Sequence, residues 1–305
     1  MPFAEVTSST GKTRFKYTIS TPNFEEAEQI DASLPTIVFF HPAFLAEHIF
    51  QAQFSDQRLR QYNLLSFDCR GHGKTTGDPA PNWYGHVEAA EDAIQLMALN
   101  SLDLPPCHLV GVSSATNTVL EIAVMEPDRV LSMFLVSPLC LEVPTEVAEG
   151  HHEIENLWTS AFPNNKTILK ELIYDAEFGE KQFLFSEPQL SSLCNAIWSI
   201  SSKTAERRWC YPFLDQYRIL AHGLKVHCSS QDEKSLARIT FPIKLIHGTK
   251  DVAFSKRYHE IFLLQLLDAG VDASLAIIDD APHCMVASHS KEYVLLLITN
   301  FYSNI

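Results

Sequence analysis

The sequence contains no closely paired cysteines and little basic charge. Its seven cysteines are scattered over 305 residues without a C-x-x-C pair, so neither a disulfide framework nor a structural zinc site is expected. With 23 Lys and Arg against 37 Asp and Glu, the formal net charge is −14. Because binding to phosphate groups requires clustered cations, we expect no nucleic-acid partner and no anionic membrane partner.

Long hydrophobic runs are also missing. The first ten residues, MPFAEVTSST, have no basic start followed by an apolar run, and no stretch approaches about 18 consecutive apolar residues. Hydrophobic residues make up 46% of the chain and charged residues 20%, which allows a sizeable core. We therefore expect a soluble, cytoplasmic protein with reduced thiols, built as one large α/β domain with an insertion. The oligomeric state is left open, with a homodimer among the alternatives.

Short runs of β-branched and aromatic residues alternate with helical patterns, which is typical of βαβ units and a mainly parallel sheet. Six runs predict strands buried on both faces: 36–40, 62–67, 107–112, 130–136, 243–247 and 273–278. Apolar residues at helical spacing predict four helices between or after these strands: 86–102, 115–125, 256–269 and 291–301.

Residues 141–240 differ from the rest of the chain. They hold three of the four tryptophans and few strand-like runs, and prolines and an Asn-Asn pair interrupt their helical patterns. We expect several short helices that form a cap over the carboxyl edge of a core made of 1–140 and 241–305. The cap carries no basic cluster but many aromatic residues, which favours an apolar substrate. The candidate pocket residues are Trp158, Phe162, Tyr174, Phe183, Phe185, Trp198, Trp209, Tyr211 and Phe213.

The stretch GVSSA at 111–115 lies between a strand-like run and a helical pattern. A nucleophile needs a sharp strand-to-helix turn that lifts its oxygen clear of the sheet, with small residues on both sides. Ser113 is therefore the candidate nucleophile, and the amide N–H of Ser114 is aimed at a developing oxyanion. The match to G-x-S-x-G is imperfect because Ala115 replaces the second glycine. Taken alone, the string also fits an ordinary turn, or Ser114 as the nucleophile.

Further motifs, in the expected order over nearly the whole chain, resemble the α/β-hydrolase superfamily. The segment FFHPAF at 39–44 resembles the His-Gly-x segment after the third strand, although Pro42 stands where glycine is usual. This resemblance implies that the Ala43 N–H is the other oxyanion donor. The segment FDCRGHGKT at 67–75 is similar to a turn after the fourth strand that is usually structural. The implied architecture is a mainly parallel sheet of the eight-stranded type, flanked by helices and carrying a helical cap.

The same turn ends like a phosphate-binding loop, G-x-x-x-x-G-K-[ST]. The first glycine of that pattern should fall at position 68, where Asp68 stands instead. A carboxylate in that place would repel a triphosphate. Nucleotide binding is therefore not expected.

A serine hydroxyl needs a hydrogen-bonded base, which an acid must hold in place. By the same resemblance, His283 in DAPHC at 280–284 is the general base, and Asp251 in HGTKD at 247–251 is the acid. The chain order Ser113, Asp251, His283 is the order of this fold. Three carboxylates remain as rival acids: Glu142, Asp279 and Asp280.

The run HHEIE at 151–155 could be read as a metal site. Adjacent residues on a helix point about 100° apart, and no second cluster in the sequence completes a ligand shell. We therefore expect a solvated helix face, and neither a metal nor an organic cofactor.

Together these features predict a serine hydrolase that cleaves a carboxylic ester or lactone of a small to medium apolar substrate through an acyl-enzyme. Hydrolysis of a C–C bond or thioester, or perhydrolysis, on the same triad remains open. A non-catalytic ligand-binding member of the fold is the alternative of a different class. Epoxide hydrolase and dehalogenase chemistry is disfavoured, because those enzymes carry a carboxylate where Ser113 stands.

Overall fold

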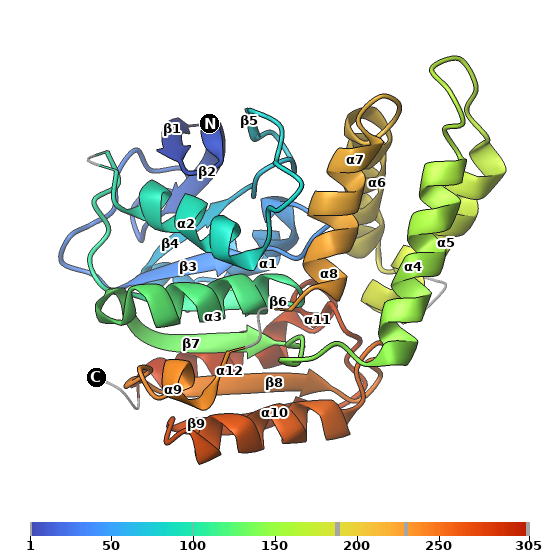
Figure 1. Ribbon diagram of the computed structural model, residues 1–305. Helices are drawn as coiled ribbons and strands as arrows, with labels where there is room; N and C mark the ends of the chain where they lie inside the picture. Colours follow the sequence, from blue (N-terminus) through green and yellow to red (C-terminus); the bar gives the residue numbers. More distant parts are fainter. Residues whose placement is uncertain (1, 100, 187–189, 229–230, 303–305) are drawn as a thin grey trace.

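The computed structural model describes residues 2–99, 101–186, 190–228 and 231–302. A sheet of nine strands runs through the molecule in the order β1-β2-β4-β3-β6-β7-β8-β9, with β5 paired to β2 (Figure 1). The six strands from β4 to β9 in this order are parallel, which confirms the predicted architecture. The strands are β1 (Phe3–Ser8), β2 (Gly11–Ser20), β3 (Thr36–Phe40), β4 (Asn63–Phe67), β5 (Thr76–Gly77), β6 (Cys107–Val112), β7 (Val130–Val136), β8 (Ile243–Gly248) and β9 (Ala273–Ile278).

All six predicted strands are present, with ends shifted by at most one residue. The strands β1, β2 and β5 were not predicted. In β2, the exposed residues Lys12 and Arg14 alternate with buried Thr13 and Phe15. A search for near-continuous apolar runs finds strands that are buried on both faces and misses such alternating strands near the sheet edge.

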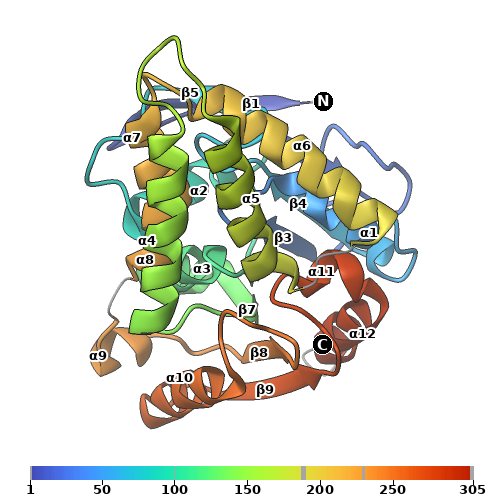
Figure 2. The same cartoon turned by 90° about the vertical axis from the view of Figure 1, so that its right-hand side faces the viewer.

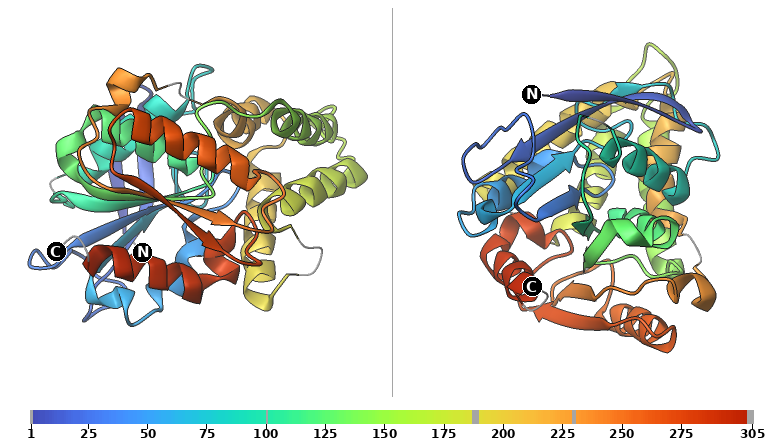
Figure 3. Two further views of the ribbon diagram at one scale, coloured as in Figure 1. Left: turned by 90° about the horizontal axis from the view of Figure 1, so that it is seen from below. Right: turned by 90° about the vertical axis from the view of Figure 1, so that its left-hand side faces the viewer.

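Helices cover both faces of the sheet, and the period of two along each strand separates two cores. In β3, Ile37 and Phe39 pack on one face, whereas Val38 and Phe40 pack on the other. Figure 3 shows α10 and α12 on opposite faces of the sheet. The helices of the core are α1 (Gln51–Phe54), α2 (His86–Met97), α3 (Ala115–Met125), α10 (Lys256–Asp268), α11 (Met285–Ser288) and α12 (Ser290–Tyr302).

Helix α2 ends earlier than the predicted residue 102. The chain leaves the helix after Met97 and turns back, with Asp103 at φ +37° and the Leu104 N–H donating to the Met97 carbonyl at 3.0 Å. The other three predicted helices agree with the structure to within one residue. The end of α2 is therefore set by the geometry of the turn and not by a loss of apolar residues at helical spacing.

Between β7 and β8, the described residues of 145–226 lie beyond the carboxyl ends of the strands, whereas residues 233–236 lie near the amino end of β8 (Figures 1 and 2). The expectation of several short helices is wrong for the first three helices of this segment, which have 16, 16 and 17 residues. Pro163 separates α4 from α5 and Pro212 separates α6 from α7, whereas Pro188 lies outside the described residues. The division into a cap of 141–240 and a core stays a prediction. The helices are α4 (Thr145–Ser160), α5 (Lys170–Phe185), α6 (Ser192–Arg208), α7 (Leu214–Tyr217), a π-helical turn (Arg218–Gly223), α8 (Leu224–Val226) and α9 (Glu233–Leu236).

The seven cysteines are free thiols, and four of them are buried: Cys107, Cys140, Cys194 and Cys284. None of the helices in the described ranges combines the length and the apolar character that crossing a membrane requires.

Candidate active site

Ser113 stands on a tight turn between β6 and α3. Its backbone has φ +53°, a left-handed conformation that is unusual for a residue other than glycine. A Cβ atom at Gly111 would lie 3.0 Å from the Ala115 carbonyl oxygen and 3.0 Å from the Thr116 Cα, so only glycine fits without a shift. The turn presents the Ser113 hydroxyl at the carboxyl edge of the sheet, as its sequence predicts.

The structure brings Ser113, His283 and Asp251 together. The His283 Nε2 lies 2.7 Å from the Ser113 Oγ, and the His283 Nδ1 lies 2.7 Å from the Asp251 Oδ2. A carboxylate can only accept, so Nδ1 carries the proton and Nε2 is free to accept the serine proton. Ser113 is 4% exposed and His283 is 3% exposed. The hydrogen-bonded chain is therefore nearly closed off from bulk water.

The Asp251 carboxylate is held by more than the imidazole. Its Oδ1 accepts the N–H of Ala253 at 2.8 Å and of Phe254 at 2.9 Å. Burial, the largest single influence, would raise the pKa of Asp251, but the attraction and hydrogen bond of His283 and the Phe254 N–H together lower it. The group therefore stays ionised at neutral pH and keeps the imidazole in one tautomer.

The rival acids lie elsewhere. Glu142, Asp279 and Asp280 are all exposed. The Asp280 carboxylate forms an ion pair with Lys250 at 3.6 Å, and Asp251 is the carboxylate bonded to the imidazole of His283. Among the described carboxylates, the predicted acid is thus the one that contacts the predicted base.

A pair of buried imidazoles packs behind Asp251, which sequence reasoning missed. The His259 Nε2 donates to the Pro138 carbonyl at 3.0 Å, so its Nδ1 accepts from the His247 Nδ1 at 2.9 Å. Burial lowers the pKa of His259 to about 4, which keeps the ring neutral. The Asp251 oxygens lie within 4.8 Å of both rings, but they already bond to His283 and to two amides. The pair therefore supports the acid without adding charge beside it.

The two predicted oxyanion donors are near each other, but one is engaged. The Ala43 N–H donates to the Ser114 Oγ at 2.8 Å, and the next amide, of Phe44, donates to the His72 Nε2 at 3.1 Å. Among the described residues no acceptor bonds to the Ser114 N–H. The sequence predicts that Ser114 contributes its amide to the oxyanion site, whereas in the structure its hydroxyl also takes part, by accepting the Ala43 N–H.

The turn at 68–75 holds the loop that carries Ala43. The Asp68 carboxylate accepts the N–H of Glu47 at 3.0 Å and of Lys74 at 2.7 Å. His72 donates through Nδ1 to the Arg70 carbonyl at 2.9 Å, so Nε2 is left to accept from Phe44. Burial is the main cause that lowers the pKa of His72 to about 3, so the ring is neutral. These contacts agree with a structural turn rather than a phosphate loop.

The helix face at 151–155 differs in part from expectation. His152 is exposed, as predicted, but His151 is buried and stacks on Phe183 with ring centroids 4.4 Å apart. His222, from the π-helical turn, brings a third ligand-type atom within 4.8 Å of those of His152 and Glu155, a juxtaposition that the sequence spacing does not reveal. Glu155 already forms a salt bridge with Arg218 at 3.0 Å.

The aromatic residues of 141–240 divide into two groups. Tyr174, Tyr211 and Phe213 are exposed and cannot line a buried pocket. Most of the others pack inward. The ring of Trp158 stacks on that of Tyr217 with centroids 5.0 Å apart, and the ring of Trp198 stacks on that of Phe44 with centroids 5.4 Å apart.

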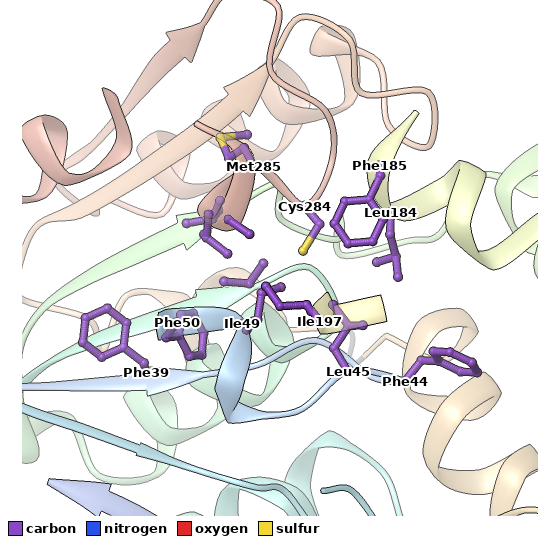
Figure 4. Packing of buried hydrophobic residues seen from close by; sticks show 14 of the residues in the cluster. Phe39, Phe44, Leu45, Ile49, Phe50, Leu184, Phe185, Ile197, Cys284 and Met285 are labelled. Atoms are coloured by element: carbon purple, nitrogen blue, oxygen red, sulfur yellow. The ribbon is translucent and has the colours of Figure 1, made fainter. Parts of the chain in front are cut away.

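This aromatic layer also reaches the loop that carries His283. The Cys284 N–H donates to the Leu184 carbonyl at 2.7 Å. Figure 4 shows Leu184, Phe185 and Cys284 side by side, with Ile197 close to them. The end of α5 is therefore fixed against the loop of the candidate base.

The model of the alpha/beta hydrolase fold family matches residues 35–284. The chain belongs to this family. Its match covers the turn of Ser113, the turn of Asp251 and the loop of His283, in the order that the family resemblance implied.

Several known proteins are similar to this member of the family. A mouse protein described as sn-1-specific diacylglycerol lipase ABHD11 is 34% identical over 108 residues, which is 35% of this chain and 33% of the length of that lipase. A thermophilic esterase from Thermogutta terrifontis has a TM-score of 0.73 at 15% identity, covering 100% of this chain and 99% of that one. An enol-lactonase from Burkholderia xenovorans LB400 has a TM-score of 0.70 at 17% identity, covering 98% of both chains.

Proposed function

We propose that this protein is a serine hydrolase that cleaves a carboxylic ester or lactone of a small to medium apolar substrate. The observation that carries the proposal is the unbroken hydrogen-bonded chain from Ser113 through His283 to Asp251, with both links at 2.7 Å. A buried carboxylate, an oriented imidazole and a hydroxyl at a strand-to-helix turn together form an activated nucleophile. The proposed partner is a small-molecule substrate, and the seven free thiols fit a cytoplasmic location.

In the proposed reaction, the Ser113 Oγ attacks the carbonyl carbon while the His283 Nε2 takes its proton. Asp251 stabilises the imidazolium that forms, and the carbonyl oxygen becomes an oxyanion. The tetrahedral intermediate then collapses, and His283 returns the proton to the leaving alcohol. Water hydrolyses the acyl-enzyme by the same route in reverse. This chemistry needs neither a metal nor an organic cofactor.

The oxyanion is proposed to bind to the N–H and the hydroxyl of Ser114. The hydroxyl accepts the Ala43 N–H at 2.8 Å, and its own proton remains to be donated. Ser114 is 3% exposed, so bulk water does not compete for that proton. A hydroxyl that accepts one hydrogen bond becomes a stronger donor in the next. Ala43 therefore acts on the oxyanion through Ser114.

Replacing Ser114 by alanine is expected to lower kcat by about 10- to 100-fold and to change KM little, because a donor to the transition state is lost. Sulfur is a weaker acceptor than oxygen, so the loss should be smaller for a thionoester than for the matching ester. Steady-state kinetics on both substrates measure this difference.

Ser132→Ala is the matched control, since Ser132 is a buried hydroxyl in β7 that bonds to His108 at 2.7 Å, away from the site. It should leave both rates unchanged. A rise in kcat for Ser114→Ala would mean that the hydroxyl obstructs the oxyanion site. Equal losses for ester and thionoester would reduce Ser114 to a structural role.

The substrate preference follows from the layer of aromatic residues over the site. Trp158, Phe185 and Trp209 are buried in the same apolar cluster as Phe44, next to the oxyanion segment. Such a layer binds an acyl or alcohol group by contact rather than by ion pairing. The names of the similar structures, an esterase and an enol-lactonase, agree with an ester or lactone bond.

The proposal is tested by labelling with a fluorophosphonate, peptide mapping and a panel of acetate to octanoate esters. We expect label on Ser113 and a gain in kcat/KM of about three- to fourfold per methylene until the pocket is full. The rates should be nearly independent of salt, because no surface ion pair is screened. If kcat/KM for a thioester or for a substrate with a cleavable C–C bond exceeds that for every ester, the reaction is thioester or C–C bond hydrolysis instead. Tight ligand binding without labelling or turnover would favour a non-catalytic member of the family.

A further inference from the structure

A cavity of about 570 Å³ lies between α6 and the core. Its wall comes from β2, residues 25–26, the segment 44–55, the end of β4 with Asp68, residues 71–74 and part of 200–209; Ser113, Asp251 and His283 do not line it. Figure 2 shows α6 passing across the front of β4 and α1, which carry part of the wall. A cavity of this volume is large enough for a small organic ligand.

Part of the lining of this cavity is apolar. The rings of Phe44, Phe50, Phe54 and Trp209 contribute to the wall, and Ile200 lies at its exposed rim. Figure 4 shows Phe44 and Phe50 on the segment that follows β3. These side chains offer contact to a hydrocarbon chain but no directional partner.

The lining also includes four basic and four acidic side chains, so the pairing of these charges decides what the cavity can bind. The Lys16 ammonium forms a salt bridge with Glu47 and donates to Thr18, and burial lowers its pKa to about 8. Glu47 also accepts from Ser66 at 3.1 Å. Asp68 is satisfied by the amides of two other residues, as described above. These deeper charges are thus already compensated within the protein.

Arg208 is different. This half-buried side chain lies at the end of α6 and donates from Nη2 to the Gly73 carbonyl at 2.9 Å. No carboxylate among the described residues lies within salt-bridge distance of it. A guanidinium offers five N–H donors in a planar fork that matches carboxylate and phosphate groups. Asp68 attracts this charge through space, but no carboxylate in the described part of the chain bonds to it. Arg208 therefore brings a cation with free N–H donors to the wall of the cavity.

We propose that this cavity binds a single-chain amphiphile with an anionic head, which Arg208 holds while the chain packs against Phe50, Phe54 and Trp209. Ser113, Asp251 and His283 do not line this cavity, although Phe44 and Trp209 belong both to its wall and to the aromatic layer over the hydrolytic site. Binding here does not depend on the hydrolytic reaction proposed above. The sequence suggested no basic cluster in 141–240, but folding brings Arg207 and Arg208 to the same cavity as Lys16 and Lys74 of the core. A carboxylate and a phosphate head share the chemistry that fits this position.

The test measures the equilibrium binding of four twelve-carbon probes by tryptophan fluorescence and by calorimetry. Each probe is used below the concentration at which it forms micelles. Dodecanoate and dodecyl phosphate should bind, whereas dodecanol and dodecyltrimethylammonium should bind at least tenfold more weakly. Arg208→Gln should weaken dodecanoate binding by about 10- to 100-fold, the effect of losing a charged hydrogen-bonded pair. The ratio between the two anions distinguishes a carboxylate from a phosphate ligand.

Lys203→Gln is the matched control, because it removes the same charge from an exposed position of α6 outside the cavity. It should leave binding unchanged. Ile200→Glu, at an exposed rim position, should weaken both dodecanoate and dodecanol and keeps the proposal testable if Arg208→Gln does not fold. Ser113→Ala should bind dodecanoate like the unaltered protein.

Three results would overturn the proposal: equal affinity for dodecanol and dodecanoate, equal losses in Arg208→Gln and Lys203→Gln, or loss of binding after Ser113 is blocked with a fluorophosphonate. The last result would assign the ligand to the hydrolytic site. Binding is measured without turnover, so a failure of the hydrolase proposal and a failure of this one are told apart.

Discussion

Ser113→Ala is expected to lower kcat by about 10⁴-fold or more, because the three residues of a triad act as a unit and the remaining two have no nucleophile to activate. The substitution removes one oxygen from a side chain that bonds only to His283 among the described side chains. The backbone bond from the Ser113 N–H to the Val136 carbonyl, 2.9 Å long, is kept, so the turn should still form. Initial rates with a 4-nitrophenyl ester measure the loss, and thermal denaturation verifies the fold.

Ser114→Ala separates this prediction from its nearest alternative. It should keep the fluorophosphonate label on Ser113, and its loss of kcat, about 10- to 100-fold, should be far smaller than the loss in Ser113→Ala. If Ser114→Ala abolishes labelling and Ser113→Ala does not, the nucleophile has been assigned one residue too early in the turn.

Asp251→Asn is expected to reduce kcat by about 10²- to 10⁴-fold in a folded protein. The amide has no charge to stabilise an imidazolium, and it can present an N–H where the His283 Nδ1–H needs an acceptor. The amides of Ala253 and Phe254 can still donate to the side-chain oxygen, so the local turn is kept. The measurement is kcat at a fixed pH near neutrality, together with near-ultraviolet circular dichroism.

Glu142→Gln is the control for the acid, because Glu142 is an exposed carboxylate that was a rival for the same role. This substitution should lower kcat only a little. The opposite pattern of rates, with Glu142→Gln inactive and Asp251→Asn active, would make Asp251 a structural residue.

The sequence predicted those parts of the fold whose signal is local. The strands β3, β6 and β7 are continuous apolar runs because both of their faces are covered, and such runs can be recognised without knowing their neighbours. Strand β1 was missed because its exposed residues alternate with buried ones. The lengths of α4 to α6 were also missed, because interruptions by proline mark where a helix stops but not how far it runs.

Some features of the candidate site could likewise be predicted from the sequence, and others could not. The grouping of Ser113, Asp251 and His283 could be predicted, because parallel strands end at one edge and the chain order matched the family, although the catalytic roles stay predictions. The bond between Ala43 and Ser114 could not, since it joins side chain to backbone across 71 residues. The burial of His259 could not be predicted either. Its helix, α10, looks exposed in the sequence, yet His259 is fully buried against His247.

The position of β9 bears on how this protein loses activity. This strand is the last of the sheet, pairs only with β8 and has one buried residue among its six, yet the loop that follows it carries His283. Edge elements with few buried contacts open locally at a smaller free-energy cost than the whole molecule unfolds. We therefore expect the segment that carries the proton acceptor of the proposed reaction to open at a smaller free-energy cost than the central strand β6, which precedes the nucleophile. Inactivation by heat or denaturant should then report the opening of this edge and precede the loss of the central strands.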